Sequence, residues 1–423
     1  MDKNETICLL NDSFPPLIDG VANTVMNYAA ELQSSPYQPV VITPNHPQAR
    51  DEDFPYPILR YPSIQAQRFE GYPAGIPFSP EIARFLDERN VAILHSHCPI
   101  ISTFMARQLR QITDAPLVLT YHTKFDVDIE HVIKSKPMQL AARKALVANI
   151  SACDEVWAVS RGAGENLRSL GYEGEYVIMT NGVDLPRQRA DERTIQAAAR
   201  GYDLPNGVPV YLFVGRLMWY KGLRIIEDAL AALNARGKDF RMVFIGTGDD
   251  SAEIRTYAQS RGIAHKCIFT GAIHDRELLR GWYSRADLFL FPSTFDTNGL
   301  VVREAASCAL ASVLIRNSCA GEGVCDGRNG FLIEENPESL VALLLTLSPG
   351  ETAAVGENAS RELYISWEDA VKNARERYEI ILDRHRSGLY PPHREPSEGV
   401  MKMNGELMDA LSRLSALRDR RSL

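Results

Sequence analysis

The stretch VGRLMWYKG at residues 214–222 decides the fold of this chain. It ends the apolar run Val210–Val214, and a helical pattern begins directly after it. A buried strand that opens through a glycine loop into a helix is typical of a parallel α/β sheet. Arg216 and Lys221 are close enough in this loop to face one anionic group, which suits a diphosphate. The alternative is a solvated pair of cations. The loop lacks the GxxxxGK[ST] pattern, so it does not predict a P-loop NTPase.

The same alternation of short apolar runs and helical segments extends in both directions. Continuous apolarity suits strands that are buried on both faces. The expected strands are Ile7–Asn11, Val40–Thr43, Ala92–Ser96, Leu117–Tyr121, Glu155–Val159, Tyr176–Met179, Val210–Val214, Arg241–Gly246, Cys267–Thr270, Leu288–Phe291, Ser312–Ile315 and Phe331–Ile333. The expected helices between the first six are Asn23–Gln33, Pro80–Glu88, Thr103–Gln111, Met138–Ser151 and Gly162–Ser169. The pattern predicts two doubly wound α/β domains, with the interdomain cleft as the expected ligand site.

Composition excludes several classes of protein. The 423 residues suffice for two or three domains, and 46 Lys and Arg against 54 Asp and Glu argue against a general nucleic-acid binder. The apolar segment Ile7–Leu10 is too short for a signal peptide, and no apolar run is long enough to span a membrane. The seven cysteines form no CxxC pair, which favours reduced packing thiols in the cytoplasm. A zinc site on Cys308, Cys319 and Cys325 is the alternative.

A second cluster of chemistry-bearing residues is the stretch FPSTFDTNGLVVREA at residues 291–305. Asp296 lies in the loop after a strand, and Glu304 lies about one turn inside the following helix. The two carboxylates can address different parts of one extended ligand. The N–H groups of Gly299, Leu300 and Val301 at the helix start can receive phosphate oxygens. The alternative for Asp296 alone is a helix N-cap.

Three further features follow strands. The loop NDSFPPLIDGVAN at residues 11–23 contains Gly20, which permits close backbone approach to a ligand, or simply a tight turn. We expect free N–H groups at the helix start near Asn23. Gly246 and Gly248 flank Thr247 in a second close-approach turn, and His122 follows a first-domain strand as a ligand-facing or a core histidine.

Taken in order, the motifs GRLMWYKG, GTG and PSTFDTNGLVVREA resemble the retaining glycosyltransferases of family 4, which have the GT-B fold. The resemblance covers about residues 5–385, and the FPPLIDGV start and Tyr121-His122-Thr123 look most like bacterial members that glucosylate diacylglycerol. It implies an N-terminal acceptor-binding domain at 1–190 that the crossing helix 366–386 completes. It also implies a nucleotide-sugar domain at 207–365 and a helical tail at 387–423.

The resemblance also implies a role for each matching residue. Arg216 and Lys221 would bind the donor diphosphate, Glu304 the ribose hydroxyls and Asp296 the transferred sugar, while His122 would face the reacting sugar. The remaining donor-binding positions would be Gly20, Gly215, Gly246, Gly248, Gly299, Leu300 and Val301. The family usually has Glu at Asp296, Phe at Asn298 and a Gly-Gly pair at Asp19-Gly20, so the identity of the sugar stays open.

The expected activity is transfer of a hexose from a nucleotide sugar, such as UDP-glucose, with retention of configuration. No cofactor or metal is expected, because two cations serve the diphosphate. The favoured acceptor is a membrane lipid, diacylglycerol or a glycolipid. The alternatives are a soluble or polysaccharide acceptor, a non-catalytic nucleotide-sugar-binding subunit, and a related epimerase or phosphorylase.

The expected location is cytoplasmic, peripheral on the inner face of the membrane. Within the range Lys124–Lys144, basic residues (Lys124, His131, Lys134, Lys136, Arg143 and Lys144) interleave with apolar ones (Ile129, Val132, Ile133, Met138 and Leu140). This stretch would rest on anionic lipid, with the loop at 72–78 as a shallow anchor; a solvated helix face is the alternative. The tail helix at 401–421, with apolar positions Leu407, Met408, Leu411, Leu414 and Leu417, would pack on its own protein, on a second copy in a homodimer, or on a membrane.

Overall fold

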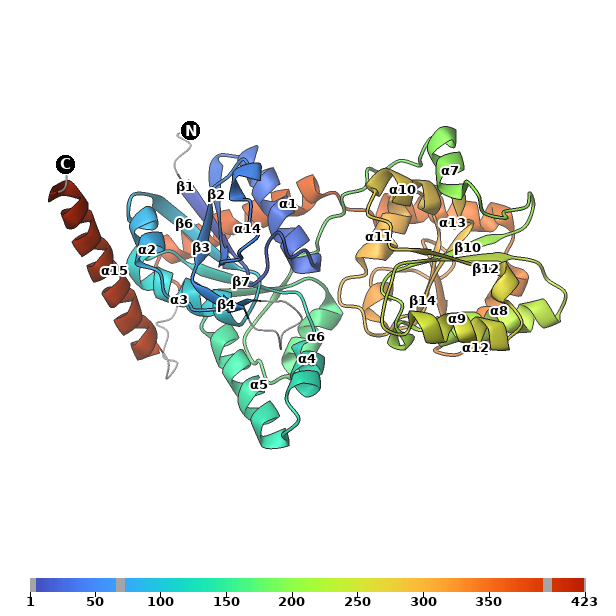
Figure 1. Cartoon of the computed structure of the whole chain (residues 1–423), viewed down its shortest axis with the longest axis horizontal. Coiled ribbons are helices and arrows are strands. Elements are labelled where there is room, and N and C mark those ends of the chain that lie inside the picture. The colour runs from blue at the N-terminus through green and yellow to red at the C-terminus, as the bar shows by residue number, and fades with distance from the viewer. Residues whose placement is uncertain (1–4, 66–72, 391–397, 422–423) are drawn as a thin grey trace. The chain divides into compact units, whose positions relative to one another are not determined.

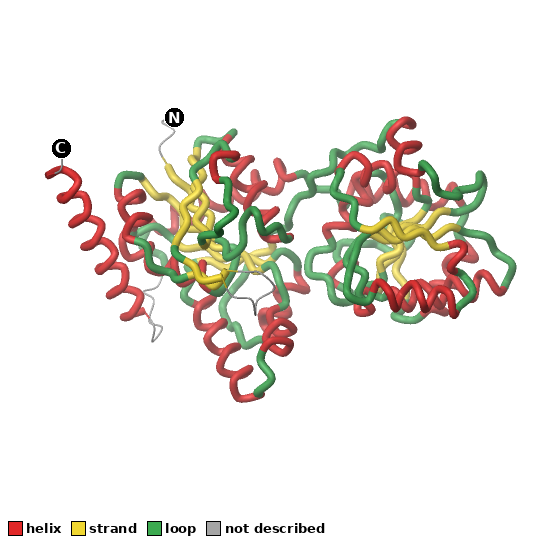
Figure 2. Tube along the Cα trace, in the orientation of Figure 1, coloured by secondary structure: helices red, strands yellow, loops and turns green. Residues whose placement is uncertain are grey.

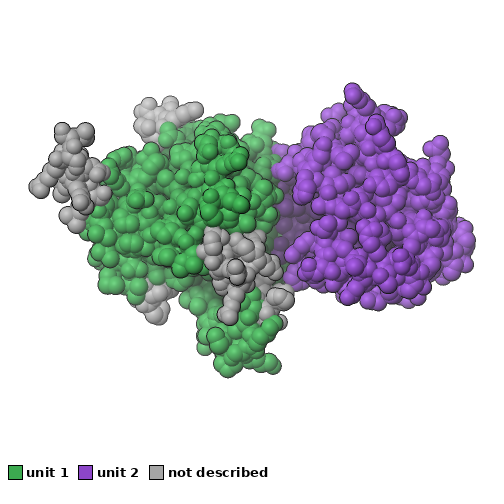
Figure 3. All heavy atoms as spheres, in the orientation of Figure 1, with its two compact units in different colours: residues 1–180, 367–423 green, residues 181–366 purple. Residues whose placement is uncertain are grey.

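The computed structural model describes residues 5–65, 73–390 and 398–421. The chain divides into two compact units, coloured separately in Figure 3. The first unit comprises Met1–Thr180 and Trp367–Leu423, and the second comprises Asn181–Ser366. Tyr72 of the expected anchor loop lies outside the described residues.

The first unit is built on a seven-stranded parallel sheet in the order β3-β2-β1-β6-β7-β8-β9. Its strands are β1 (Glu5–Leu10), β2 (Tyr37–Pro44), β3 (Ile58–Tyr61), β6 (Asn90–Ser96), β7 (Leu117–Tyr121), β8 (Glu155–Ala158) and β9 (Val177–Ile178), and β4 (Ser63–Gln65) pairs antiparallel with β5 (Pro73–Gly75). Its helices are α1 (Gly20–Gln33), α2 (Pro80–Asp87), α3 (Ile101–Thr113), α4 (Phe125–Val132), α5 (Lys136–Ser151), α6 (Arg161–Ser169), α14 (Trp367–Arg386) and α15 (Glu398–Arg421).

The second unit is built on a six-stranded parallel sheet in the order β12-β11-β10-β13-β14-β15. Its strands are β10 (Val210–Val214), β11 (Arg241–Ile245), β12 (Cys267–Gly271), β13 (Leu288–Phe291), β14 (Ser312–Ile315) and β15 (Phe331–Ile333). Its helices are α7 (Glu192–Ala199), α8 (Leu223–Ala235), α9 (Ser251–Ser260), α10 (Arg276–Arg285), α11 (Leu300–Ser307), α12 (Pro337–Thr346) and α13 (Pro349–Glu362).

The central strands of both sheets form from continuous apolar runs because they are buried on both faces. Every residue of β7, β10 and β13 is buried, as the continuous apolar runs predict. Helices cover both faces of each sheet (Figure 2), so the prediction of two Rossmann-like doubly wound domains is confirmed. The sequence reading missed β3 and the β4–β5 pair, which are short and lie outside the regular rhythm.

Helices α14 and α15 follow the second unit in the sequence but pack within the first. In α14, Tyr378 is fully buried and Arg377 forms a bidentate ion pair with Glu155 of β8. Figure 1 shows α15 beside α2 and α3, which are its packing partners. Among the described residues no single helix is long and apolar enough to cross a bilayer; α12 and α13, bent by 109° where they meet, pass that test only when joined.

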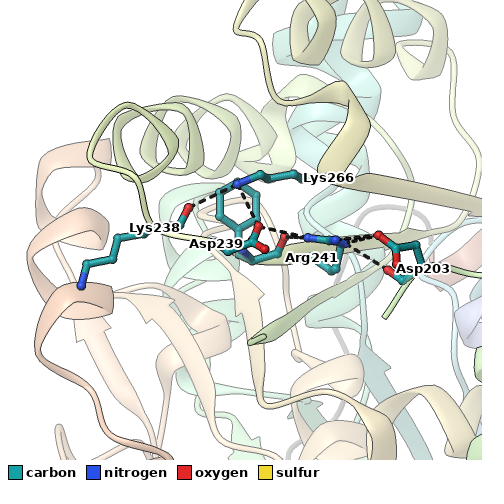
Figure 4. A network of polar contacts seen from close by, with 6 residues as sticks. Asp203, Lys238, Asp239, Arg241 and Lys266 are labelled. Atoms are coloured by element: carbon teal, nitrogen blue, oxygen red, sulfur yellow. Dashed lines mark hydrogen bonds and ion pairs between the residues drawn. The ribbon is translucent and has the colours of Figure 1, made fainter. Parts of the chain in front are cut away.

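A polar network links the chain segments at the amino-terminal ends of three strands in the second sheet (Figure 4). Arg241, the first residue of β11, donates to the carboxylates of Asp203 and Asp239 at 2.6 and 3.1 Å. The Lys266 ammonium lies 2.8 Å from the same Asp239. The network therefore fixes the segment before β10 to the starts of β11 and β12, at the edge opposite the loops described next.

Candidate functional site

Three loops meet at the carboxyl ends of β10, β11 and β13. They touch backbone to backbone because glycines stand at the contacts. A Cβ on Gly246 (φ +135°) would lie 2.0 Å from the Gly215 carbonyl oxygen, and one on Gly222 (φ +78°) would lie 2.0 Å from the Pro292 carbonyl oxygen. A Cβ on Gly248 would lie 2.4 Å from the Leu217 carbonyl oxygen. The structure thus brings the three sequence motifs of this unit together, and it explains these glycines by packing.

Lys221 and Asp296 form the central contact between two of these loops. The Lys221 Nζ atom lies 2.8 Å from Asp296 Oδ2, and the lysine is buried. Burial by itself would raise the pKa of Asp296, but the charge and hydrogen bond of Lys221, together with the N–H groups of Gly299 and Asn298, hold that pKa below its usual value. The ring of Phe295 lies within 5.9 Å of the ammonium. The arrangement holds a desolvated cation at the end of the sheet, ready for an anion.

The start of α11 faces the same place. Asp296 Oδ1 accepts hydrogen bonds from the N–H of Gly299 at 3.0 Å and of Asn298 at 3.4 Å, so Asp296 is a cap of this helix. The expectation that Gly299 offers a free N–H is therefore wrong in this state. The N–H groups of Leu300 and Val301 have no hydrogen-bond partner among the described residues. They remain donors for a phosphate.

Arg216 differs from Lys221 in its surroundings. Its side chain is exposed and makes no hydrogen bond or ion pair with any described residue. Of the two cations in this loop, Lys221 is buried and paired with Asp296, whereas Arg216 is exposed and not held by an ion pair to any described residue. An incoming diphosphate would meet both.

Glu304 lies on α11 with both carboxylate oxygens engaged. Oε1 accepts from the Arg276 guanidinium at 2.7 Å, and Oε2 accepts from the Tyr283 hydroxyl at 2.9 Å. Arg276, the first residue of α10, also lies 3.6 Å from Asp184. These contacts fix the carboxylate in one orientation while leaving lone pairs for a ligand. The sequence reading missed both partners, whose only signal is their place on the helix before β13.

In the first sheet, Asp19, Gly20 and His122 follow the carboxyl ends of the strands: Asp19 and Gly20 come after β1, and His122 comes after β7. Helix α1 begins at Gly20, and Asp19 Oδ1 accepts from the N–H of Val21 at 2.8 Å and of Ala22 at 2.7 Å. The prediction of free N–H groups at this helix start is therefore wrong for these two, because the Asp19 carboxylate occupies them. A Cβ on Gly20 would meet nothing within 4 Å, so the backbone is open there.

His122 follows β7 and is buried. Its Nε2 atom lies 3.0 Å from Nδ1 of His97, which follows β6. Burial lowers the pKa of His122 to about 3, against a smaller opposing effect from the Asp19 carboxylate. The imidazole is thus neutral at physiological pH. The sequence reading did not single out His97.

The basic stretch of the first unit forms α4, α5 and their connection. Val132, Met138 and Leu140 are 59%, 62% and 56% exposed, and Lys134, Lys136 and Lys144 are exposed as well. Ile129 packs on the core instead, and the His131 side chain lies outside the described residues. Apolar and cationic side chains are therefore both exposed to solvent along this stretch, and we call the six residues Val132, Lys134, Lys136, Met138, Leu140 and Lys144 the α4–α5 surface.

The zinc hypothesis fails on geometry. In the part of the chain that the structure describes, no group of three or more His, Cys, Asp or Glu side chains is placed to hold a metal ion. Cys308 is buried, while Cys325 is exposed.

Comparison with known proteins gives the same two halves. The family described as Glycosyltransferase Family 4 matches residues 18–187, and the family Glycosyl transferases group 1 matches residues 195–361. A GDP-mannose-dependent alpha-mannosyltransferase of Corynebacterium glutamicum is 26% identical over 78% of this chain and 76% of its own. An alpha-monoglucosyldiacylglycerol synthase of Acholeplasma laidlawii is 22% identical over 84% and 91%. The crystal structure of Anabaena HepE in complex with UDP is 18% identical, with a TM-score of 0.72 over 89% of this chain and all (100%) of that one.

Proposed function

This chain is a glycosyltransferase of family 4 with the GT-B fold, and we propose that it transfers a hexose from a nucleotide sugar to a membrane lipid with retention of configuration. The favoured donor is UDP-glucose and the favoured acceptor is diacylglycerol or a glycolipid. The observation that carries the donor site is the buried ion pair between Lys221, which shares the loop after β10 with the unpaired Arg216, and Asp296, which caps α11.

The donor diphosphate would draw Lys221 away from Asp296. Lys221, Arg216 and the N–H groups of Leu300 and Val301 then stabilise the negative charge that grows on the leaving nucleoside diphosphate. Asp296, released from the ammonium, accepts hydrogen bonds from hydroxyls of the transferred sugar. Glu304, already oriented by Arg276 and Tyr283, accepts those of the ribose.

The chemical step balances without a covalent intermediate. The bond between C1 of the sugar and the β-phosphate oxygen breaks, and the acceptor oxygen bonds to C1 on the same face. The acceptor proton passes to the departing phosphate oxygen. The proposal needs no divalent cation, because Arg216 and Lys221 supply the positive charge.

The α4–α5 surface supports the lipid acceptor. Exposed apolar side chains between lysines can insert shallowly while the ammonium groups lie at anionic headgroups. Two of the relatives are named for such a lipid, the alpha-monoglucosyldiacylglycerol synthases of Acholeplasma laidlawii and Streptococcus pneumoniae. We therefore place the protein peripherally on the cytoplasmic face of a membrane.

The test is transfer of labelled sugar into the organic phase from UDP-glucose, with vesicles that contain diacylglycerol and an anionic lipid. GDP-mannose serves as a second donor. Label in the lipid that depends on diacylglycerol supports the proposal, whereas label only in soluble products would overturn the lipid acceptor. The paired variant Lys134→Glu/Lys136→Glu should lose vesicle binding but keep competition by free UDP, and a matched reversal at the exposed Lys238 of the second unit should lose neither.

A further inference from the structure

Two buried histidines stand side by side at the ends of neighbouring strands in the first unit. The rings of His97 and His122 stack with centroids 5.3 Å apart and planes 25° apart. Their single hydrogen bond joins His97 Nδ1 to His122 Nε2 at 3.0 Å. One of these two nitrogens carries the shared proton, and the surroundings of His97 decide which.

The other nitrogen of His97, Nε2, is buried and has no partner among the described residues. If His122 donated the shared proton, neutral His97 would carry its own proton on Nε2, leaving an unpaired N–H in the interior. If His97 donates from Nδ1, only a lone pair is left unpaired. A buried N–H without a partner is rare in native structures. The second arrangement is therefore favoured.

We propose that His97 is a positioning residue that donates its Nδ1–H to His122 Nε2 and thereby fixes His122 as the tautomer protonated on Nδ1. This inference rests on the proposed function and on the role that the family resemblance implies for His122, which is to face the reacting sugar. His122 then offers the sugar an N–H donor, and its only lone pair is already occupied. It binds a hydroxyl oxygen of the donor sugar and does not take the proton of the acceptor.

The surroundings keep both rings neutral. The His95 ring is tilted by 34° against that of His97 with centroids 4.1 Å apart, and it hydrogen-bonds to Tyr378 of α14 and Thr120 of β7. Tyr28 of α1 meets His97 edge-on at 5.3 Å. Burial, with the neighbouring His95 and His122, holds the pKa of His97 well below its usual value. The Asp19 carboxylate at the start of α1 is the charged group that acts on His122.

The direct test is the tautomer itself. Long-range ¹⁵N–¹H NMR of the histidine rings in the wild-type protein, assigned with the His97→Asn and His122→Asn variants, should show His122 protonated on Nδ1 and bare on Nε2. The reverse pattern would overturn the inference. This readout needs no substrate, so its failure is separate from a failure to find transfer.

The kinetic test replaces the hydrogen-bond donor at position 97 with a hydrogen-bond acceptor. His97→Asn keeps an N–H that can reach His122 and should stay within about fivefold of the wild-type kcat. His97→Asp, when ionised, can only accept, so it would flip His122 to the wrong tautomer and should lower kcat about a hundredfold with little change in the donor KM. Equal rates for both variants would overturn the inference. His95→Asn, in the same cluster but without a bond to His122, is the control for damage to packing; a fall in kcat matching that of His97→Asp would overturn it too.

Discussion

Replacing Lys221 with methionine removes the ammonium but keeps much of the buried chain length. The expected loss of stability follows from what stays behind. Asp296 would be left as an uncompensated carboxylate whose side chain is only 22% exposed. Breaking a fully buried pair costs about 3–5 kcal/mol. Here two N–H groups still bind Asp296, so we expect about 2 kcal/mol, or roughly 4–8 °C in Tm for a unit of this size.

The same change removes a cation from the leaving group, so transfer should fall by about two to three powers of ten. Arg216→Ala is the matched control, because that side chain is exposed and unpaired in the described structure. It should lower transfer by a similar factor with no change in Tm. The double variant Lys221→Met/Asp296→Asn should recover most of the Tm and none of the rate, since the new amide side chain would still cap α11 without a buried charge.

The assay is UDP release with a thermal melt of each variant. The pH dependence of the Tm is a further check on the stabilisation by the Lys221–Asp296 pair. Asp296 has a lowered pKa in the folded state, so the pair stabilises fully above about pH 4 and its contribution is lost as the pH falls through that lowered pKa. The Tm difference between wild type and Lys221→Met should therefore shrink in acid. An unchanged Tm together with transfer within threefold of wild type would refute the reasoning.

Three further variants test other parts of the account. Glu304→Gln should weaken competition by free UDP about tenfold, because a neutral amide binds the ribose and Arg276 less strongly; unaltered competition would reject the ribose role. Glu227 is fully buried without a partner in the described structure, and burial raises its pKa to about 8. Stability should therefore fall as the pH rises from about 4.5 towards 8, and Glu227→Gln should abolish that fall in Tm; parallel pH curves would contradict it. Gly405→Leu should release α15 and expose it to proteolysis, because even a Cβ there lies 2.9 Å from the Gln108 carbonyl oxygen; unchanged cleavage would contradict this packing.

The central strands were predictable because they are buried on both faces. β7, β10, β13 and β14 begin and end where the apolar runs do. The loops that follow them were predictable for the same reason, since chemistry-bearing residues at the carboxyl ends of parallel strands converge. Edge elements such as β3 lack that uniform burial and escaped the pattern.

The contacts within the site were less predictable, because they join residues far apart in sequence. Arg276 and Tyr283 reach Glu304 from another helix, and His97 reaches His122 from another strand. Capping by Asp19 was visible as a residue type but was not weighed against the anion site at α1.

The tail helix shows another limit of periodicity. Of its predicted apolar positions, Met408 is buried against the first unit, while Leu407 and Leu411 are 50% and 40% exposed. The side chains of Leu414 and Leu417 lie outside the described part. The face of α15 that packs on the rest of the first unit also contains Met401 and Gly405, which were not among the predicted apolar positions. Gly405 determines which face of α15 packs, because the absence of a side chain lets α15 approach the backbone of α3.

The anomeric configuration of the product is the decisive measurement for the proposed transfer reaction. UDP-α-glucose labelled with ¹³C at C1 would be incubated with diacylglycerol-containing vesicles, and the extracted glycolipid examined by NMR. We expect an α-glycoside, formed by same-face attack as the nucleoside diphosphate leaves. A β-glycoside would contradict the mechanism and require a base that takes the acceptor proton on the opposite face of the sugar.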